Sequence, residues 1–347
     1  MATALLSGER GFAGSGSGSQ AAQHPAIMNR RGAGCIEGDF GSRFAGVLIG
    51  NTAWYSYRQM HTGDVWSLLN YLIENGISGC ELHTFAIEPF AGAPPQSKSS
   101  AGLRPGTPEM DALTRWRLSA PMSKFEELRR MYAAQGVNIY AYKLEPIYDS
   151  FPDGVFDYVF NAAKALGADQ VTMELPGKYT GQVTSTGRHV SRIDNALTGR
   201  IGKIAAQHKI MVGWHEHLDA SPTLWDVAMS QSAYNGINID VGHYIAAGNH
   251  DVIEFIRNHH ERITSIHLKD RCYPDHNNGS NEVWGQGDTP LKGILQLMRD
   301  QKYTFPGTIE LEYAIPKNSN PVIESGRCLA WAKDVLLSNG PQIAATA

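Results

Sequence analysis

Short apolar segments alternate with longer amphipathic segments from Phe44 to the C-terminal part of the chain. Runs of four to eight residues rich in β-branched and aromatic side chains indicate strands, while apolar residues spaced three and four apart indicate helices. Eight segments have the strand pattern. They cover residues 45–50, 78–83, 137–142, 170–175, 210–215, 236–240, 263–268 and 307–312. Strands that alternate with helices in this way predict βα units around a parallel sheet.

The segments between the predicted strands carry helix boundary signals. The run VWSLLNYLIENG closes with Gly76, and SKFEELRRMYAAQG offers a capping box of Ser123 and Glu126 ahead of Gly136. Eight such units predict an α/β protein with a closed (β/α)8 TIM barrel rather than an open doubly wound sheet. No GxGxxG motif follows the first strand, which argues against dinucleotide binding.

The organisation of the chain follows from the same pattern. Residues 1–40 contain GFAGSGSGSQAAQH and little periodic apolar content, so we expect a flexible N-terminal extension. Residues 41–340 are expected to form a single TIM-barrel domain. Its long insertion at about 84–120 holds APPQSKSSAGLRPGTP and is interpreted as a lid or substrate-specificity segment, with a disordered surface insertion as the alternative.

Composition narrows the class of ligand. Hydrophobic residues make up 42% of the chain and charged residues 18%, which is enough apolar material for one large core. The net charge of −4 gives no electrostatic reason to bind nucleic acid or an anionic membrane, so we expect a small ligand that is neutral or weakly charged. Homo-oligomerisation is left open.

The cysteines and the N-terminus bear on location. The four cysteines are far apart and have neither zinc-knuckle nor disulfide-framework spacing, so we expect reduced thiols: Cys35, Cys80, Cys272 and Cys328. No stretch is long and apolar enough for a membrane span, and the pair Arg30-Arg31 precedes a polar, glycine-rich stretch unlike an export signal. The sequence therefore predicts a cytoplasmic protein without a membrane partner.

Ionisable residues collect at the ends of the later predicted strands. Side chains there converge on one pocket in a barrel, and burying several charges without a partner is costly. A bound divalent cation would supply that partner, and a mixed carboxylate and imidazole set suits Mn²⁺, Mg²⁺, Co²⁺, Fe²⁺ or Zn²⁺. We expect Mn²⁺. The residues are Glu174, His215, Glu216, His217, Asp240, His243, His267, Lys269, Glu310 and Glu312.

Four short motifs carry a family resemblance. NIDVGHY, SIHLKD, a GQGD loop and a final IELEY resemble the xylose-isomerase-like superfamily of sugar phosphate isomerases and epimerases, over most of Phe44 to Leu337. The resemblance implies a metal that binds two adjacent oxygens of a sugar or keto acid. It implies Asp240 and His267 as ligands, together with Glu312, for which Glu310 is the alternative. Many members carry a glutamate ligand on strand five.

This chain has the run His215-Glu216-His217 on strand five, which leaves the fourth ligand open between Glu174, one strand earlier, and His215. We expect Glu174 to be the ligand and His215 to be catalytic. The resemblance implies an enzyme that abstracts a proton alpha to the carbonyl of a sugar or keto-sugar through a metal-stabilised enediolate. The expected catalytic residues are His215, His217 and Lys269, and the expected substrate-binding residues are Glu216, His243 and Trp284. For His243, a hydrogen-bonded pocket residue is an equal alternative.

The outcome of the proton transfer stays open at this point. Family members that epimerise use two facing glutamates, whereas a histidine can remove a proton and return it to a leaving group, which favours β-elimination. The segments AWYSYR and TRWRLSAPMSKFEEL resemble a branch acting on keto-sugars and keto-glycosides, including C-glycoside deglycosidases and inosose dehydratases. Isomerase or epimerase is the main prediction, and a β-eliminating lyase is the alternative. A non-catalytic carbohydrate-binding barrel is a third hypothesis, and an apurinic endonuclease is disfavoured by the acidic balance.

Overall fold

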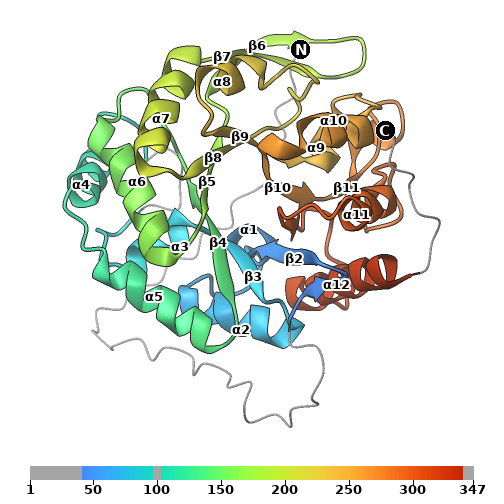
Figure 1. The fold of residues 1–347 in the computed structure, drawn as a ribbon, viewed down its shortest axis with the longest axis horizontal. Coiled ribbons are helices and arrows are strands. Elements are labelled where there is room, and N and C mark those ends of the chain that lie inside the picture. Colours follow the sequence, from blue (N-terminus) through green and yellow to red (C-terminus); the bar gives the residue numbers. More distant parts are fainter. Residues whose placement is uncertain (1–40, 97–102, 339–347) are drawn as a thin grey trace.

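A computed structural model describes residues 41–96 and 103–338, so the predicted N-terminal extension lies outside the described residues. Eight parallel strands form a closed ring in chain order, because the last one, β13, pairs with β2, which also pairs with β3 (Figure 1). This closure confirms the predicted (β/α)8 TIM barrel and excludes an open sheet. The strands are β2 (Val47–Thr52), β3 (Gly79–His83), β4 (Asn138–Leu144), β5 (Gln170–Glu174), β8 (Met211–His215), β9 (Asn235–Asp240), β10 (Ile263–Leu268) and β13 (Gly307–Ile309).

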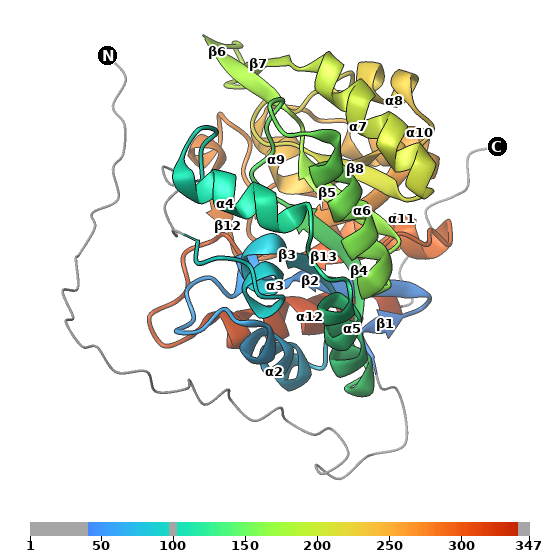
Figure 2. The ribbon, with the colours of Figure 1, turned by 90° about the vertical axis from the view of Figure 1, so that its left-hand side faces the viewer.

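Helices surround the ring of strands, as Figures 1 and 2 show. Helix α2 begins after Asp64, whose carboxylate accepts from two backbone amides, and ends at Gly76 in the left-handed conformation, as predicted. The capping box is not formed, because Ser123 is already the first residue of α5 and Met122 occupies the N-cap. The surrounding helices are α2 (Val65–Asn75), α5 (Ser123–Ala134), α6 (Asp153–Leu166), α7 (Asn195–His208), α8 (Asp226–Gln231), α10 (Val252–His259), α11 (Leu291–Asp300) and α12 (Pro321–Leu337).

The inserted segment after β3 forms two helices in its described part, α3 (Thr84–Phe90) and α4 (Pro108–Arg117). The Arg117 guanidinium on α4 donates to both carboxylate oxygens of Glu88 on α3, at 2.7 and 3.0 Å, and both side chains are buried. The hydroxyl of Tyr158 on α6 donates to the same carboxylate at 3.1 Å. The described part is therefore docked on the barrel, and the interpretation as a disordered surface insertion does not hold for it. Its role as a lid stays a prediction.

Smaller elements follow several strands. A hairpin of β6 (Gly177–Val183) and β7 (His189–Ile193) lies between β5 and α7, where no strand was predicted. The others are β1 (Arg43–Phe44), α1 (Ala53–Ser56), α9 (Val241–Ala246), the 3-10 turns η1 (His260–Arg262) and η2 (Asn277–Gly279), and the hairpin of β11 (Asp270–Arg271) and β12 (Asn281–Glu282). Across the described ranges no helix has the length and apolar character needed to cross a membrane.

Large side chains fill the barrel interior beneath the strand ends. Tyr140 of β4 reaches across to Thr308 of β13, and the two hydroxyls lie 2.8 Å apart. A Cβ atom on Gly50 of β2 would come within 2.5 Å of the Tyr140 ring, so only glycine fits there. Polar side chains lie nearer the carboxyl ends of the strands, which we call the open end of the barrel.

Candidate metal centre and active site

Four buried side chains meet at the carboxyl ends of neighbouring strands. His215 ends β8, Asp240 ends β9, His267 is the penultimate residue of β10, and Glu310 follows directly after β13. Each offers one potential ligand atom, and these atoms all lie within 4.8 Å of one another. Because β8, β9, β10 and β13 are consecutive in the ring, the closure of the barrel brings the four together. We call this set the barrel-mouth group.

The neighbours of His215 determine which of its nitrogens is available. Its Nδ1 lies 2.7 Å from Oδ1 of Asn238, whose amide nitrogen donates to the hydroxyl of Ser265. The Asn238 oxygen therefore accepts the Nδ1 proton, which leaves the lone pair on Nε2. Burial, reinforced by the positive charges of Lys143 and His267, lowers the pKa of His215 well below its usual range. The imidazole is thus neutral, the form that binds cations.

His267 lies between two carboxylates. Its Nδ1 is 2.9 Å from Oε2 of Glu310, and its Nε2 faces Oε1 of Glu81 on β3 at 3.3 Å. Thr172 donates a hydrogen bond to the other oxygen of Glu81. Although burial alone would lower it, the two carboxylates raise the pKa of His267 to about 10. The surroundings of this imidazole therefore favour positive charge.

Lys269 supplies positive charge beside the barrel-mouth group. Its Nζ lies 2.9 Å from Oδ2 of Asp240, 3.3 Å from Oε2 of Glu310 and 2.7 Å from Oε2 of Glu312. Oδ1 of Asp240 accepts from the backbone amide of His243 at 2.8 Å and so caps α9. One oxygen of Asp240 thus has a structural role, while the other points into the group.

The donor set of the barrel-mouth group fits a divalent metal. Among the described residues, Oδ2 of Asp240 is buried and makes no hydrogen bond of acceptable geometry, although Lys269 Nζ lies 2.9 Å away. Buried polar atoms normally have such partners. Two imidazoles and two carboxylates match the preferences of first-row divalent cations. Glu81 would be the carboxylate behind a ligating imidazole that orients it.

Two of the predicted ligands lie outside the group. Oε1 of Glu174 pairs with Lys143 Nζ at 2.8 Å, and its Oε2 lies 3.7 Å from Nδ1 of His217. Glu312 pairs with Lys269 and, at 3.5 Å, with Arg58. The structure therefore groups Asp240 and His267 with the two residues that the sequence had offered as alternatives, His215 and Glu310. The ligand assignments themselves stay predictions.

The other predicted site residues surround the group. The side chain of His217 is 47% exposed, and its ring centroid lies 5.2 Å from that of His215. His243 is buried, with Lys269 Nζ 3.1 Å from its Nε2 and Arg271 Nη1 2.8 Å from its Nδ1. Burial and these cations lower its pKa well below the usual range. The carboxylate of buried Glu216 accepts from the backbone amide of Asp240 at 3.1 Å.

Trp284 lies in the loop after β12. Its ring is buried and packs edge-on against Trp331 of α12, with centroids 5.7 Å apart. Asp270 holds the loop by accepting from the backbone amides of Gly285 at 2.7 Å and Gly287 at 3.0 Å. This packing gives Trp284 a structural contact, and its contact with substrate stays a prediction.

Polar residues also lie near the carboxyl ends of β3 and β4, and they were not predicted as site residues. Lys143 at the end of β4 lies 4.9 Å above the ring of Tyr55, whose hydroxyl donates to Glu145. His83 at the end of β3 lies 3.3 Å from the same carboxylate. The residues on the later strands were predicted because they are ionisable and stand at strand ends. The same signal is present in SGCELH and in NIYAYKLE, so it could have identified these residues too.

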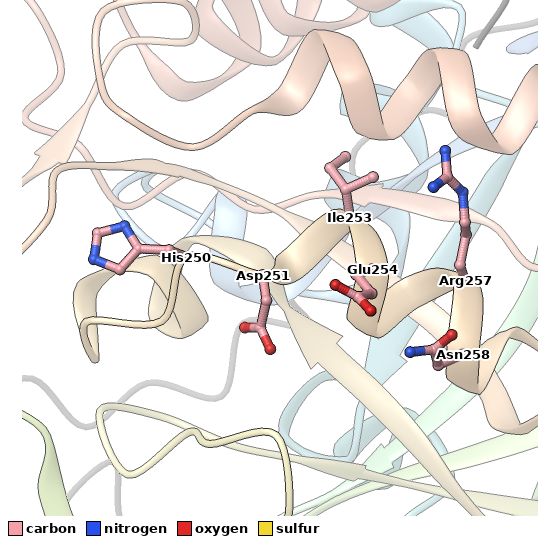
Figure 3. Close-up of a pocket in the computed structure, with 6 residues that line it drawn as sticks. All are labelled: His250, Asp251, Ile253, Glu254, Arg257 and Asn258. Carbon is pink, nitrogen blue, oxygen red and sulfur yellow. The ribbon is translucent and has the colours of Figure 1, made fainter. Parts of the chain in front are cut away.

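A surface depression on α10 lies apart from the barrel-mouth group. Figure 3 shows its six lining side chains, with His250 at one end and Arg257 at the other, pointing in different directions. Asp251 accepts from the hydroxyl of Tyr244 at 2.9 Å, a contact within the helical layer. This depression has no convergent set of charged groups comparable to the barrel mouth.

Comparison with known proteins gives a consistent result. The family model described as xylose isomerase-like TIM barrel matches residues 116–331. No curated protein sequence matches the chain. Solved structures with TM-scores of 0.54 and 0.55 share its fold.

One of them is the probable 3-DHS dehydratase AsbF of Bacillus anthracis, which is involved in petrobactin synthesis. Its sequence is 14% identical to this chain and its TM-score is 0.54, and the match covers 85% of this chain and 100% of AsbF. The IolI protein with a bound zinc atom is 13% identical with a TM-score of 0.55, covering 84% and 99%. An L-ribulose 3-epimerase is 11% identical with a TM-score of 0.54, covering 84% and 95%. At these identities the likeness shows the fold.

Proposed function

Because the chain belongs to the family of xylose isomerase-like TIM barrels, we propose that it is a metal-dependent enzyme that removes a proton next to the carbonyl of a sugar or keto-sugar. The observation that carries the proposal is the barrel-mouth group, four buried ligand-type side chains within 4.8 Å. The similar structures include a zinc-bound protein, a dehydratase and a sugar epimerase, which supports both the metal and the substrate class. A cytoplasmic location and a homo-oligomer stay predictions.

We propose His215, Asp240, His267 and Glu310 as the metal ligands. A divalent cation bound there would polarise the substrate carbonyl and stabilise the negative charge that develops when the neighbouring proton leaves. The mixed nitrogen and oxygen set admits Mn²⁺, which we expect first, and also Fe²⁺, Co²⁺ or Zn²⁺. Asn238 and Glu81 would orient the two imidazoles from behind.

The proposed base is His217. Its Nδ1 faces Oε2 of Glu174 at 3.7 Å, where the carboxylate would stabilise the positive charge that the ring gains when Nε2 takes a proton from substrate. Lys143 holds Glu174 in this position through the contact at 2.8 Å. Lys269 would contact a substrate oxygen from the other side of the barrel mouth. Both lysines are almost fully buried, which strengthens their electrostatic effect on a bound substrate.

Isomerisation or epimerisation is the first candidate outcome, and β-elimination is the second. Elimination is favoured by one observation, that the carboxylates of Glu174 and Glu312 are both ion-paired to buried lysines at 2.8 and 2.7 Å. A carboxylate that takes a proton from substrate would have to give up its lysine partner. An imidazole such as His217 has no such cost and can return the proton to a leaving group.

Deuterium exchange tests the proposal. The metal-loaded protein would be incubated in D₂O with a panel of ketoses, keto-glycosides and inososes, and the products analysed by NMR. We expect deuterium on the carbon next to the carbonyl of at least one substrate. Deuterium without release of a fragment or water identifies an isomerase or epimerase, whereas release identifies a lyase. The variant His217→Ala should lose exchange with its metal retained, while the control His61→Ala, at an exposed position ahead of α2, should behave as the unmodified protein. Sugar binding with neither exchange nor release would contradict the proposal and favour a carbohydrate-binding barrel.

A further inference from the structure

A second set of ligand-type side chains lies in the segment that follows β10. Cys272 comes directly after β11, His276 precedes η2, and Asp288 closes the GQGD loop. One potential ligand atom from each of the three lies within 4.8 Å of the others. Cys272 is buried, Asp288 is partly buried and His276 is exposed. This loop group shares no residue with the barrel-mouth group.

Hydrogen bonds orient two of the three side chains. Nδ1 of His276 lies 2.7 Å from Oδ2 of Asp288, and the same oxygen accepts from the backbone amide of Tyr273 at 2.8 Å. Oδ1 of Asp288 has no hydrogen-bond partner among the described residues. Nδ1 of His276 and Oδ2 of Asp288 are therefore close enough for one cation to replace the proton between them and bind both atoms.

The thiol of Cys272 faces two polar side chains. Its Sγ lies 3.9 Å from Oε1 of Glu282, and it also hydrogen-bonds with the side chain of Ser280. That carboxylate oxygen already accepts from Asn277 at 2.8 Å and from the hydroxyl of Ser280. The thiol therefore lies directly beside an acidic side chain. Glu282 is placed where it could supply a further oxygen ligand.

The charge of the segment also favours a cation. Residues 270–289 contain four acidic side chains, Asp270, Asp275, Glu282 and Asp288, against the single basic Arg271. A divalent cation would offset this negative charge, and it would convert the thiol to the thiolate that binds metal.

We propose that Cys272, His276 and Asp288 bind a second divalent cation, for which zinc is the metal that their thiolate, imidazole and carboxylate suit. The cation joins both ends of the segment, so it holds the loop that carries Trp284 against Asp270. The expectation that Cys272 is a plain reduced thiol rested on the spacing of cysteines alone. The structure adds a histidine and an aspartate that the fold brings next to it.

Cobalt substitution tests the proposal, because a thiolate bound to Co²⁺ produces a charge-transfer absorption band in the near ultraviolet. The barrel-mouth group offers only nitrogen and oxygen ligands, so it cannot produce this band. We expect the cobalt-loaded chain to bind two ions and to show the band. Cys272→Ser should lose the band and one of the two ions. His276→Ala, at an exposed position, should weaken cobalt binding at the loop and reduce the band even if Cys272→Ser folds poorly.

Two kinds of control separate this site from the barrel mouth and from other thiols. His267→Ala should lose the barrel-mouth ion but keep the band, so failure of the proposed enzyme site is distinguishable from failure of the loop site. Cys35→Ser and Cys328→Ser should leave the band unchanged. Absence of the band from the cobalt-loaded unmodified chain, or its persistence in Cys272→Ser, overturns the proposal.

Discussion

Two glutamates that follow β13 offer a matched pair of substitutions. Glu310 contacts His267 and Lys269 inside the barrel mouth, whereas Glu312 pairs with Lys269 and Arg58 nearer the surface. The exposed fractions of the two side chains are 6% and 26%. We predict that Glu310→Gln abolishes stabilisation of the protein by divalent metal and that Glu312→Gln preserves it.

The expected magnitude follows from linkage between binding and unfolding. A metal present at one hundred times its Kd stabilises the folded state by about 2.7 kcal/mol, if it does not bind the unfolded chain. For large domains each kcal/mol shifts Tm by about 2–4 °C, so saturating metal should raise Tm by roughly 5–10 °C. The barrel-mouth ligands come from four strands, so this increment depends on the folded ring. Loss of one carboxylate ligand should reduce it to near zero.

Differential scanning calorimetry of each variant, with and without added Mn²⁺, measures the increment. Comparing the same variant in the two conditions removes the direct effect of the substitution on the metal-free protein, which matters because Glu310 also compensates the charges of His267 and Lys269. The loop group would be held constant by carrying Cys272→Ser in every variant. Equal increments in Tm for Glu310→Gln and Glu312→Gln would refute the reasoning. Loss of the increment in Glu312→Gln alone would also refute it and would make Glu312 the ligand.

Three further predictions follow from the contacts. His215→Ala should lose the barrel-mouth metal, whereas Glu174→Gln should keep the metal and show reduced turnover. Elemental analysis of the gel-filtered variants measures the metal content. The reverse pattern would make Glu174 the ligand. Arg117→Met should destabilise the protein by about 3–5 kcal/mol in urea unfolding, because Glu88 would be left as a buried, uncompensated charge. Adding Glu88→Gln should recover part of the loss, and a loss under about 1 kcal/mol would contradict a buried ion pair that holds α4. Glu81→Gln should weaken metal binding by about 10–100-fold in chelator competition, as expected for a carboxylate that orients a ligating imidazole, and unchanged affinity would exclude that role.

Local sequence patterns determined most of the barrel. Eight strands were predictable because each is a short apolar run bounded by helix signals, and Gly76 marked a helix end that the structure confirms. The predicted capping box of Ser123 and Glu126 was wrong, because α5 begins at Ser123 itself, one residue earlier than the motif requires. The β6–β7 hairpin was missed because its exposed residues lack the apolar alternation of a half-buried strand.

The sequence by itself also placed Asp240 and His267 at the open end of the barrel, because carboxyl ends of parallel strands converge whatever the details of packing. It could not choose between His215 and Glu174, or between Glu310 and Glu312. Those choices depend on which way each side chain turns. The fold turns Glu174 toward Lys143, and it brings Glu310 rather than Glu312 within reach of His267.

Contacts between distant segments were likewise decided only by the tertiary structure. Glu81 lies behind His267 because β3 and β10 face one another across the closed ring, a relation that no local pattern encodes. Cys272 approaches His276 and Asp288 because the segment folds back on itself around the β11–β12 hairpin. The spacing of apolar residues determines which segments form strands. Which side chains meet at a site depends on the directions in which they point, and only the closed barrel defines these.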